Sequence, residues 1–356
     1  MKKMQDYIVR GKDVFIGLED SKRTWKISVR SEKMEIHYTS MPAEYSVLHS
    51  YLKRSYPSCK VMIIYEAGFK GFGLHDRLVE DGYLCVVTPP NKVTQEKDNR
   101  VKTDKNDCKR LAKVLENGDY KSCHVPDRER REDRQISRTL SALQREITRI
   151  KNQIRRMFEF HDIESPFPAG RWSATEYRKL EEMHIDGSVG KMFELYKMML
   201  RMFLEKKNEL LKELKLLSKK AKYAETVKIL ESAPGIGPQT AIRLALEWGE
   251  RFALRFKTGK EFGSFTGLTC SEYSTGETVR RGRITNQGNR FVRSWLIECA
   301  WVAYKRDPVL LSKFQTVYGH SGSKKKAIVA VARKLAVRLW RCVGLGQTYQ
   351  VGLIEG

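Results

Sequence analysis

Short apolar runs and alternating patterns follow one another through the first third of the chain. Residues 14–18 are an apolar run, and residues 25–29 and 34–38 alternate apolar with polar side chains, as half-buried strands do. Residues 60–65 (KVMIIY) are typical of a strand buried on both faces. A fifth strand is predicted at 84–87, and helices are predicted at 42–52, 71–80 and 106–115. The order βββαβαβα predicts an α/β domain over residues 1–125, with the RNase H-like fold that RuvC-type nucleases share.

The apolar pattern then changes to that of long helices. From Ile136 to Met157 apolar residues recur at alternating spacings of 4 and 3, which predicts a coiled-coil seam. A second apolar stripe runs from Met192 to Leu217. We interpret residues 126–222 as a helical coiled-coil linker. Its two helices either form an antiparallel pair within one chain or provide a seam between subunits.

The remaining residues, 223–356, are predicted to form a mostly helical domain. Within it, the segment PGIGPQTA predicts two helices joined by a tight turn. We interpret this as a helix-hairpin-helix, which binds the DNA backbone because amide groups at a helix start attract phosphate. The candidate contacts are Gly235, Gly237 and Thr240, and an ordinary helical turn is the alternative.

The composition adds an electrostatic argument. Lys and Arg number 67 and Asp and Glu number 43, so the formal net charge is +24. This charge favours a polyanionic partner, of which nucleic acid is the commonest, with a membrane surface as the weaker alternative. No apolar run is long enough for a membrane span, so no membrane partner is expected. Seven scattered cysteines indicate reduced thiols, as in the cytoplasm.

Four acidic positions are candidate metal ligands. Glu19 ends the first strand, Glu66 ends the fourth, and Asp104 and Asp107 begin a helix. In an RNase H-like sheet the first and fourth strands lie side by side, so these carboxylates would meet at one edge. Such a cluster stays ionised only when cations compensate it, and the ligand type predicts a two-metal Mg²⁺ site in which Mn²⁺ could substitute. Asp20 is an alternative to Glu19, but strand neighbours point to opposite faces, so only one can serve.

A second candidate group lies in a loop with many hydroxyl and arginine side chains. The hydroxyls are those of Ser274 and Thr275, in a Ser/Thr-rich turn. The arginines are Arg280, Arg281, Arg283, Arg290 and Arg293. Arginines can hold a phosphate bidentately while a hydroxyl attacks it. A solvated loop without chemistry is the alternative.

Six ordered motifs carry a resemblance to a known family. They are GLEDSK, YEAG, TDKND, PGIGPQTA, FTGLTCSEYSTG and RGRITNQGNR. Together they resemble the insertion-sequence one-ten transposases, relatives of the Piv-type DNA invertases, over nearly the whole chain. The resemblance implies a RuvC-like DEDD domain, a coiled-coil segment and a C-terminal domain with a catalytic serine. It also implies a recombinase that moves a circular DNA element, guided by a bridge RNA that pairs with donor and target DNA.

The resemblance also assigns residues. Its four acids fall on Glu19, Glu66, Asp104 and Asp107, although the family usually has Asp where Glu19 stands. Its serine position falls on Thr275, with Ser274 immediately before it, so either hydroxyl is a candidate nucleophile. The implied intermediate is a covalent 5′-phosphoserine or phosphothreonine link. The implied site combines acids of one subunit with the hydroxyl of another, and therefore a homo-dimer or tetramer.

Two other functions fit the same residues. A RuvC-like structure-selective nuclease would use metal-activated water, and a decayed element would bind nucleic acid without cleaving it. Either way, the expected location is the prokaryotic cytoplasm, with association to the nucleoid when the protein acts.

Overall fold

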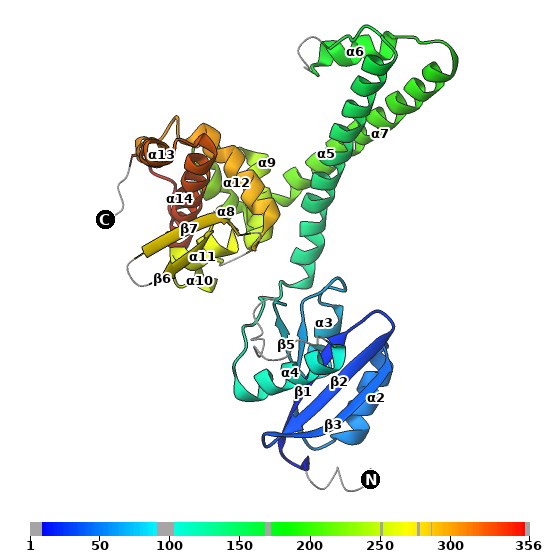
Figure 1. Cartoon of the computed structure of the whole chain (residues 1–356), viewed down its shortest axis with the longest axis vertical. Coiled ribbons are helices and arrows are strands. Elements are labelled where there is room, and N and C mark those ends of the chain that lie inside the picture. Colours follow the sequence, from blue (N-terminus) through cyan, green and yellow to red (C-terminus); the bar gives the residue numbers. More distant parts are fainter. Residues whose placement is uncertain are drawn as a thin grey trace. The chain divides into compact units, whose positions relative to one another are not determined.

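The computed structural model describes residues 9–90, 103–167, 172–249, 252–275, 278–285 and 287–352. It divides into two compact units, Met1–Pro126 and Asp127–Gly356. Figure 1 shows the elements of both units along the chain. Each unit is described by itself below.

The first unit is built around one five-stranded sheet. Its elements are β1 (Asp13–Asp20), β2 (Thr24–Ser31), β3 (Met34–Pro42), α2 (Tyr45–Ser55), β4 (Lys60–Glu66), α3 (Gly73–Glu80), β5 (Leu84–Thr88) and α4 (Asp104–Asn117). The strand order is β3-β2-β1-β4-β5, in which β2 is antiparallel to β1 and to β3, and β4 and β5 are parallel to β1. The predicted order βββαβαβα is thus confirmed, and the topology is the one that the RNase H-like prediction requires.

Helix α4 covers one face of this sheet at very close range. A Cβ atom at Gly17 of β1 would lie 2.0 Å from the carbonyl oxygen of Cys108 on α4, so only glycine fits there. On the same face, Ile64 of β4 packs against Leu111 and Leu115 of α4. The opposite face packs against α2 and α3 through residues such as Leu48 and Leu78. The two sides of each strand therefore meet different helices.

The second unit begins with a helical hairpin. Its helices are α5 (Arg128–Phe160), α6 (Ala174–Glu182) and α7 (Gly187–Leu217), and α5 and α7 run side by side in Figure 1. The predicted heptad residues Ile147, Ile150 and Ile154 are buried in one cluster with Phe193 and Leu200 of α7. The seam therefore joins two helices of the same chain, which is the first of the two arrangements that the sequence left open.

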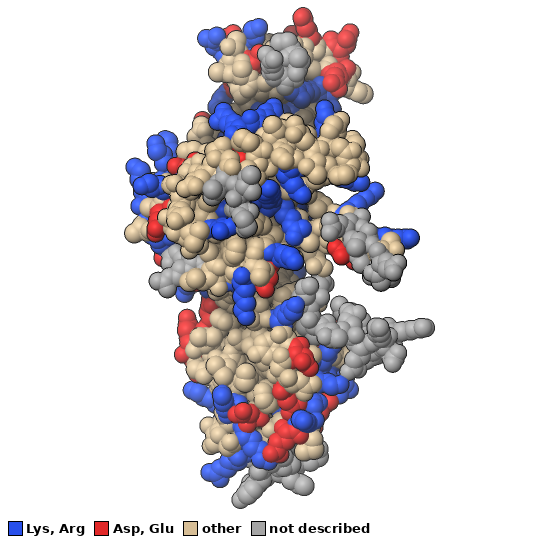
Figure 2. All heavy atoms as spheres, turned by 90° about the vertical axis from the view of Figure 1, so that its left-hand side faces the viewer, with Lys and Arg blue, Asp and Glu red and all other residues tan. Residues whose placement is uncertain are grey.

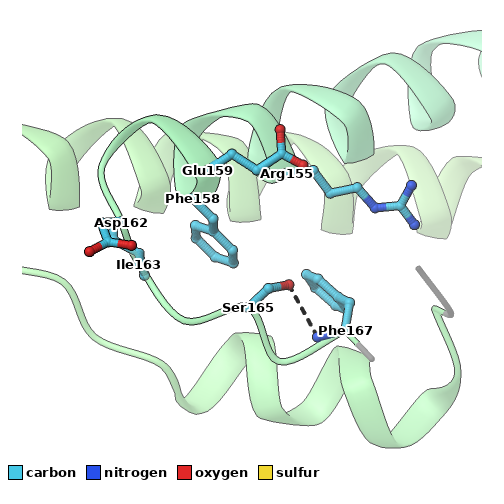
Figure 3. Close-up of a pocket in the computed structure, with 7 residues that line it drawn as sticks. All are labelled: Arg155, Phe158, Glu159, Asp162, Ile163, Ser165 and Phe167. Atoms are coloured by element: carbon cyan, nitrogen blue, oxygen red, sulfur yellow. Dashed lines mark hydrogen bonds between the residues drawn. The ribbon is translucent and has the colours of Figure 1, made fainter. Parts of the chain in front are cut away.

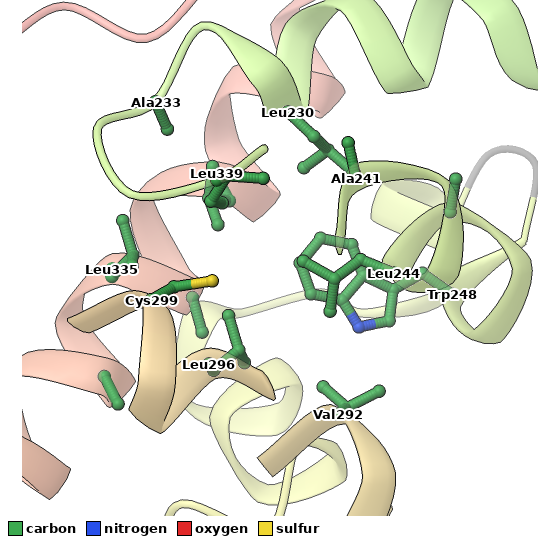
Figure 4. Packing of buried hydrophobic residues seen from close by; sticks show 14 of the residues in the cluster. Leu230, Ala233, Ala241, Leu244, Trp248, Val292, Leu296, Cys299, Leu335 and Leu339 are labelled. Atoms are coloured by element: carbon green, nitrogen blue, oxygen red, sulfur yellow. The ribbon is translucent and has the colours of Figure 1, made fainter. Parts of the chain in front are cut away.

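The beginning of α5 and the end of α7 pack against the other helices of the unit. Leu140 of α5 and Leu214 of α7 belong to the large core of the C-terminal helices rather than to the hairpin cluster. That core surrounds Trp248, Leu296 and Leu335 (Figure 4). Its elements are α8 (Ala221–Glu231), α9 (Pro238–Trp248), α10 (Phe252–Arg255), α11 (Gly259–Phe265), β6 (Cys270–Thr275), β7 (Thr278–Ile284), α12 (Arg290–Ala303), α13 (Pro308–Ser321) and α14 (Lys324–Leu345).

The segment expected to be a loop is a β-ribbon. β6 and β7 pair antiparallel from Cys270–Ile284 to Thr275–Thr278. The expectation of a loop is wrong because it weighed the Gly, Ser and Arg content over the β-forming Tyr273, Val279 and Ile284. The predicted mostly helical character of the surrounding region is confirmed. Among the described residues, no helix combines the length and the apolarity that crossing a membrane requires.

Candidate active site

Two of the predicted acids end neighbouring strands on the α4 face of the sheet. β1 and β4 are parallel, and their register brings Leu18 beside Tyr65, directly before Glu19 and Glu66. Glu19 lies two positions after Gly17, and Glu66 two after Ile64, so both face α4 by strand alternation. Burial and then the nearby charge of Glu19 raise the pKa of the Cys108 thiol on α4 to about 12.

Asp20 lies on the opposite face. Its Oδ1 accepts hydrogen bonds from Nε1 of Trp25 and Nζ of Lys70, both at 2.7 Å. Its side chain is only 9% exposed, and these contacts hold it on that face. The geometry therefore brings Glu19, rather than Asp20, to the side where the other acids lie.

The acids of α4 are presented by a capped helix start. The hydroxyl of Thr103 accepts the backbone N–H of Asn106, which fixes the first turn. Asp104 and Asp107 follow one turn apart, and both belong to this turn. Nη2 of Arg110 lies 3.1 Å from Oδ1 of Asp107 and 3.4 Å from Oε1 of Glu66. One guanidinium thus links an acid of the helix to an acid of the sheet.

A second cation contacts the other acid of α4. Nζ of Lys26 lies 2.6 Å from Oδ2 of Asp104, and this hydrogen bond raises the pKa of Lys26. Lys26 on β2 is also the cross-strand neighbour of Glu19. The strand register and these contacts therefore put the four acidic positions at one end of one face, with Arg110 beside Glu66 and Asp107 and Lys26 beside Asp104.

The donor atoms of this arrangement are of the type that hard divalent cations prefer. The candidate ligands are all carboxylate oxygens, and Lys26 and Arg110 place positive charge beside Asp104, Glu66 and Asp107. The site is not closed around an ion, however. Among the residues that the structure describes, no three Asp, Glu, His or Cys side chains are close enough to share a metal. Metal binding would therefore require Lys26 and Arg110 to move.

The candidate nucleophiles end the first strand of the β-ribbon. Ser274 pairs with Val279, and Thr275 pairs with Thr278. Strand alternation puts the two positions on opposite faces of the ribbon. The side chains of Ser274, Thr275 and Arg281 lie outside the described residues.

The other predicted arginines differ in their surroundings. Arg280 and Arg283 of β7 are exposed, and so is Arg290 at the start of α12. Arg293 is half-buried, and its Nη1 donates to the carbonyl groups of Gly267 at 3.4 Å and Thr285 at 3.3 Å. Arg293 therefore fastens the base of the ribbon, whereas the three exposed arginines face solvent.

Helices α8 and α9 form the predicted pair with a tight turn. Gly235 has φ +83°, and a Cβ there would lie 2.5 Å from the carbonyl oxygen of Cys299 on α12. Gly237 has φ −90° and open space around it, so the conformation of the turn does not require glycine at this position. Thr240 forms a hydrogen bond with the thiol of Cys299, whose pKa burial raises to about 11. Gly235 and Thr240 thus pack this turn onto α12, and their contact with DNA stays a prediction.

Comparison with known families identifies the chain. Residues 17–161, which hold the four acids, match a transposase model of the DEDD type from IS110 elements. Residues 227–315, which hold the tight turn and the ribbon, match the model of the transposase IS116/IS110/IS902 family. The chain belongs to this family of transposases.

Relatives of this transposase span most of its length. The transposase for insertion sequence element IS1533 of Leptospira borgpetersenii is 25% identical over 77% of this chain and 79% of its own. The Sinorhizobium fredii protein y4rJ, which has transposase in its name, is 28% identical over 94% of this chain and 92% of its own. Transposases cleave and rejoin DNA, so this transposase is a DNA-processing enzyme. Its DEDD domain implies dependence on a divalent cation.

Sequence analysis missed a buried acid that links α5 to the residue preceding α12. The side chain of Glu247 in α9 is fully buried and accepts hydrogen bonds from Arg134 at 2.7 Å, Arg138 at 2.8 Å and Asn289 at 2.8 Å. Burial alone would raise the pKa of Glu247, but these arginines hold it below its ordinary value. Asn289 also caps α12 by accepting from Phe291 and Val292. The signal in the sequence is the spacing of Arg134 and Arg138, one helical turn apart.

One pocket of the described chain lies within the second unit. It is at the far end of the hairpin, between the end of α5 and the segment before α6 (Figure 3). Phe158 and Phe167 line it together with Arg155, Glu159 and Asp162. No residue predicted for the active site belongs to it.

Proposed function

We propose that this transposase exchanges DNA strands at a site that combines the α4-face acids of one subunit with a hydroxyl of the ribbon tip of another. The ligands proposed for Mg²⁺, or for Mn²⁺ in its place, are Glu19, Glu66, Asp104 and Asp107. The observation that carries the proposal is their placement on one face at the ends of β1 and β4. When bound, the metal would stabilise the negative charge that develops on the phosphodiester.

The proposed nucleophile is the hydroxyl of Ser274 or Thr275. Its oxygen bonds to the DNA phosphorus, its proton passes to a base, and the 3′-oxygen of the broken strand leaves. The product is a 5′-phosphoserine or phosphothreonine ester, which the reverse step resolves. The exposed Arg280 and Arg283 support this role, because guanidinium groups can hold the phosphate oxygens.

We further propose that DNA and a structured guide RNA bind the basic surface of the second unit. On the face drawn in Figure 2, Lys and Arg are spread over the C-terminal helices of this unit, whereas a group of Asp and Glu lies at the top of the view. Helix α14 has seven basic residues and no acidic one. The free amide groups at the start of α9, after Gly237, are a further candidate phosphate contact. RNA that co-purifies with the protein and is protected from nuclease would support the guide.

We also propose a homo-oligomer, joined through the outer face of α7. Four apolar side chains stay exposed there: Met192 51%, Leu195 42%, Met198 59% and Met202 48%. Lys191 and Glu205 flank this stripe, seven positions before and after Met198. An antiparallel pairing of two α7 helices across Met198 would bring these opposite charges together. A second copy of the chain is therefore the partner that this face fits.

A suicide DNA substrate tests the proposed chemistry. We expect a covalent protein–DNA adduct that forms only with a divalent metal. One of Ser274→Ala and Thr275→Ala should lose the adduct and the other should keep it. Thr275→Ser should keep or increase it if Thr275 attacks. Peptide mapping of the adduct identifies the residue, and cleavage without any adduct would favour a nuclease that uses water.

A further inference from the structure

A side-chain cation lies between two of the acids proposed as metal ligands. Nη2 of Arg110 is 3.4 Å from Glu66 and 3.1 Å from Asp107. The three side chains are 20%, 24% and 13% exposed respectively, so water screens their charges only in part. We propose that Arg110 is a built-in counter-cation that competes with the divalent metal for Glu66 and Asp107. This inference rests on the proposed metal site.

The competition follows from the position of the guanidinium group. A metal ion that joins two carboxylates needs their oxygens at about 2.0–2.2 Å, in the space between them. For Glu66 and Asp107, Nη2 of Arg110 lies in the space between the two carboxylates. Arginine cannot lose its proton and become a ligand, so it must withdraw when the metal binds.

The contacts of the Arg110 side chain allow it to move away from the two acids. Arg110 follows Asp107 by three positions on α4, and Nη2 is the atom that contacts both acids. Its Nε is buried and has no hydrogen-bond partner within the described part of the chain. Arg110 is therefore a positioning residue. It holds both carboxylates together without metal, and it sets the metal concentration at which the site fills.

Calorimetric titration of the full chain with Mn²⁺, without DNA, tests this competition. We expect Arg110→Gln and Arg110→Met to bind Mn²⁺ more tightly by about tenfold, because one opposing charge is removed. Arg110→Lys keeps the charge and should bind within about twofold of the unaltered protein. The matched control is Lys109→Gln, which removes the same charge from the neighbouring position, where Lys109 pairs with Glu35 at 2.9 Å. Its Mn²⁺ affinity should not change.

The outcomes separate this inference from the proposed metal site. Asp107→Asn should lose Mn²⁺ binding while its melting temperature shows an intact fold. If Asp107→Asn loses binding but both neutral Arg110 variants bind Mn²⁺ no more tightly than the unaltered protein, the competition is refuted and the metal site stands. If Asp107→Asn binds Mn²⁺ like the unaltered protein, the proposed metal site is wrong and the inference fails with it.

Discussion

Asp107 and Asp20 are two acids of the first unit that the sheet separates. Asp107 contacts Arg110 on the α4 face, whereas Asp20 is held by Trp25 and Lys70 on the other face. We expect Asp107→Asn to slow metal-dependent strand cleavage by on the order of 10²- to 10³-fold, because it removes a proposed ligand of the metal that would stabilise the reacting phosphate. Asp20→Asn is the matched control and should cleave at nearly the normal rate in a gel assay. Equal losses in both variants would contradict the assignment of faces.

Glu247 is the acid whose removal should cost most stability. Its fully buried carboxylate compensates Arg134 and Arg138, so Glu247→Gln leaves buried positive charge without a partner. We expect the free energy of unfolding to fall by roughly 3 kcal/mol. Because the pKa of Glu247 is lowered in the folded protein, its contribution is present above the unfolded pKa and is lost as the pH falls through the folded pKa. Urea unfolding at neutral and acidic pH measures both effects, and Glu247→Gln should reduce the acid sensitivity.

At the scale of elements, the close approach of α4 and β1 depends on one glycine. Gly17→Ala would place a methyl group against the backbone at Cys108, so helix and sheet must move apart. We expect a loss of about 2 kcal/mol or more in stability. Asp107 belongs to the same helix. A shift of α4 should therefore also lower the rate of metal-dependent cleavage by the protein molecules that stay folded. Gly73→Ala, where a Cβ would meet open space, is the control and should leave both quantities nearly unchanged.

Buried and exposed residues of the hairpin should affect two different properties, the stability of the chain and its association with a second copy. Ile150 is buried against α7, and Ile150→Lys should lower the melting temperature because it buries a charge in the seam. Met198 is exposed on the outer face, so Met198→Glu should leave the melting temperature of the chain unchanged and lower the mass seen by light scattering. Unchanged mass for Met198→Glu would remove α7 as the subunit contact.

The elements of the first unit were predictable because their patterns are local. The alternation in residues 25–29 and the apolar run in 60–65 specify strands without reference to other parts of the chain. The choice between Glu19 and Asp20 could not be predicted from the sequence, because it depends on which face of the sheet α4 covers. The ribbon was missed since its strands are short and rich in Ser, Gly and Arg. Glu247 was missed because its arginine partners lie more than a hundred residues away.

For the whole molecule, charge should dominate binding. With a net charge of +24, binding to DNA or RNA should neutralise several phosphates and release counterions. We expect the affinity for a DNA duplex to fall on the order of a thousandfold between about 50 and 200 mM salt. A fluorescence anisotropy titration over that range measures the slope. A flat plot of log affinity against log salt would show that phosphate contacts do not dominate.

The single helix α5 gives the molecule an arm of adjustable length. Its first turns belong to the C-terminal core, and its later turns belong only to the hairpin cluster with α7. Removing one heptad from α5 and seven facing residues from α7 would shorten the arm by about 10 Å and keep the seam in register. Relatives can therefore differ in reach without altering the core that holds the ribbon, so the arm is a spacer that evolution can lengthen or trim in steps of seven residues.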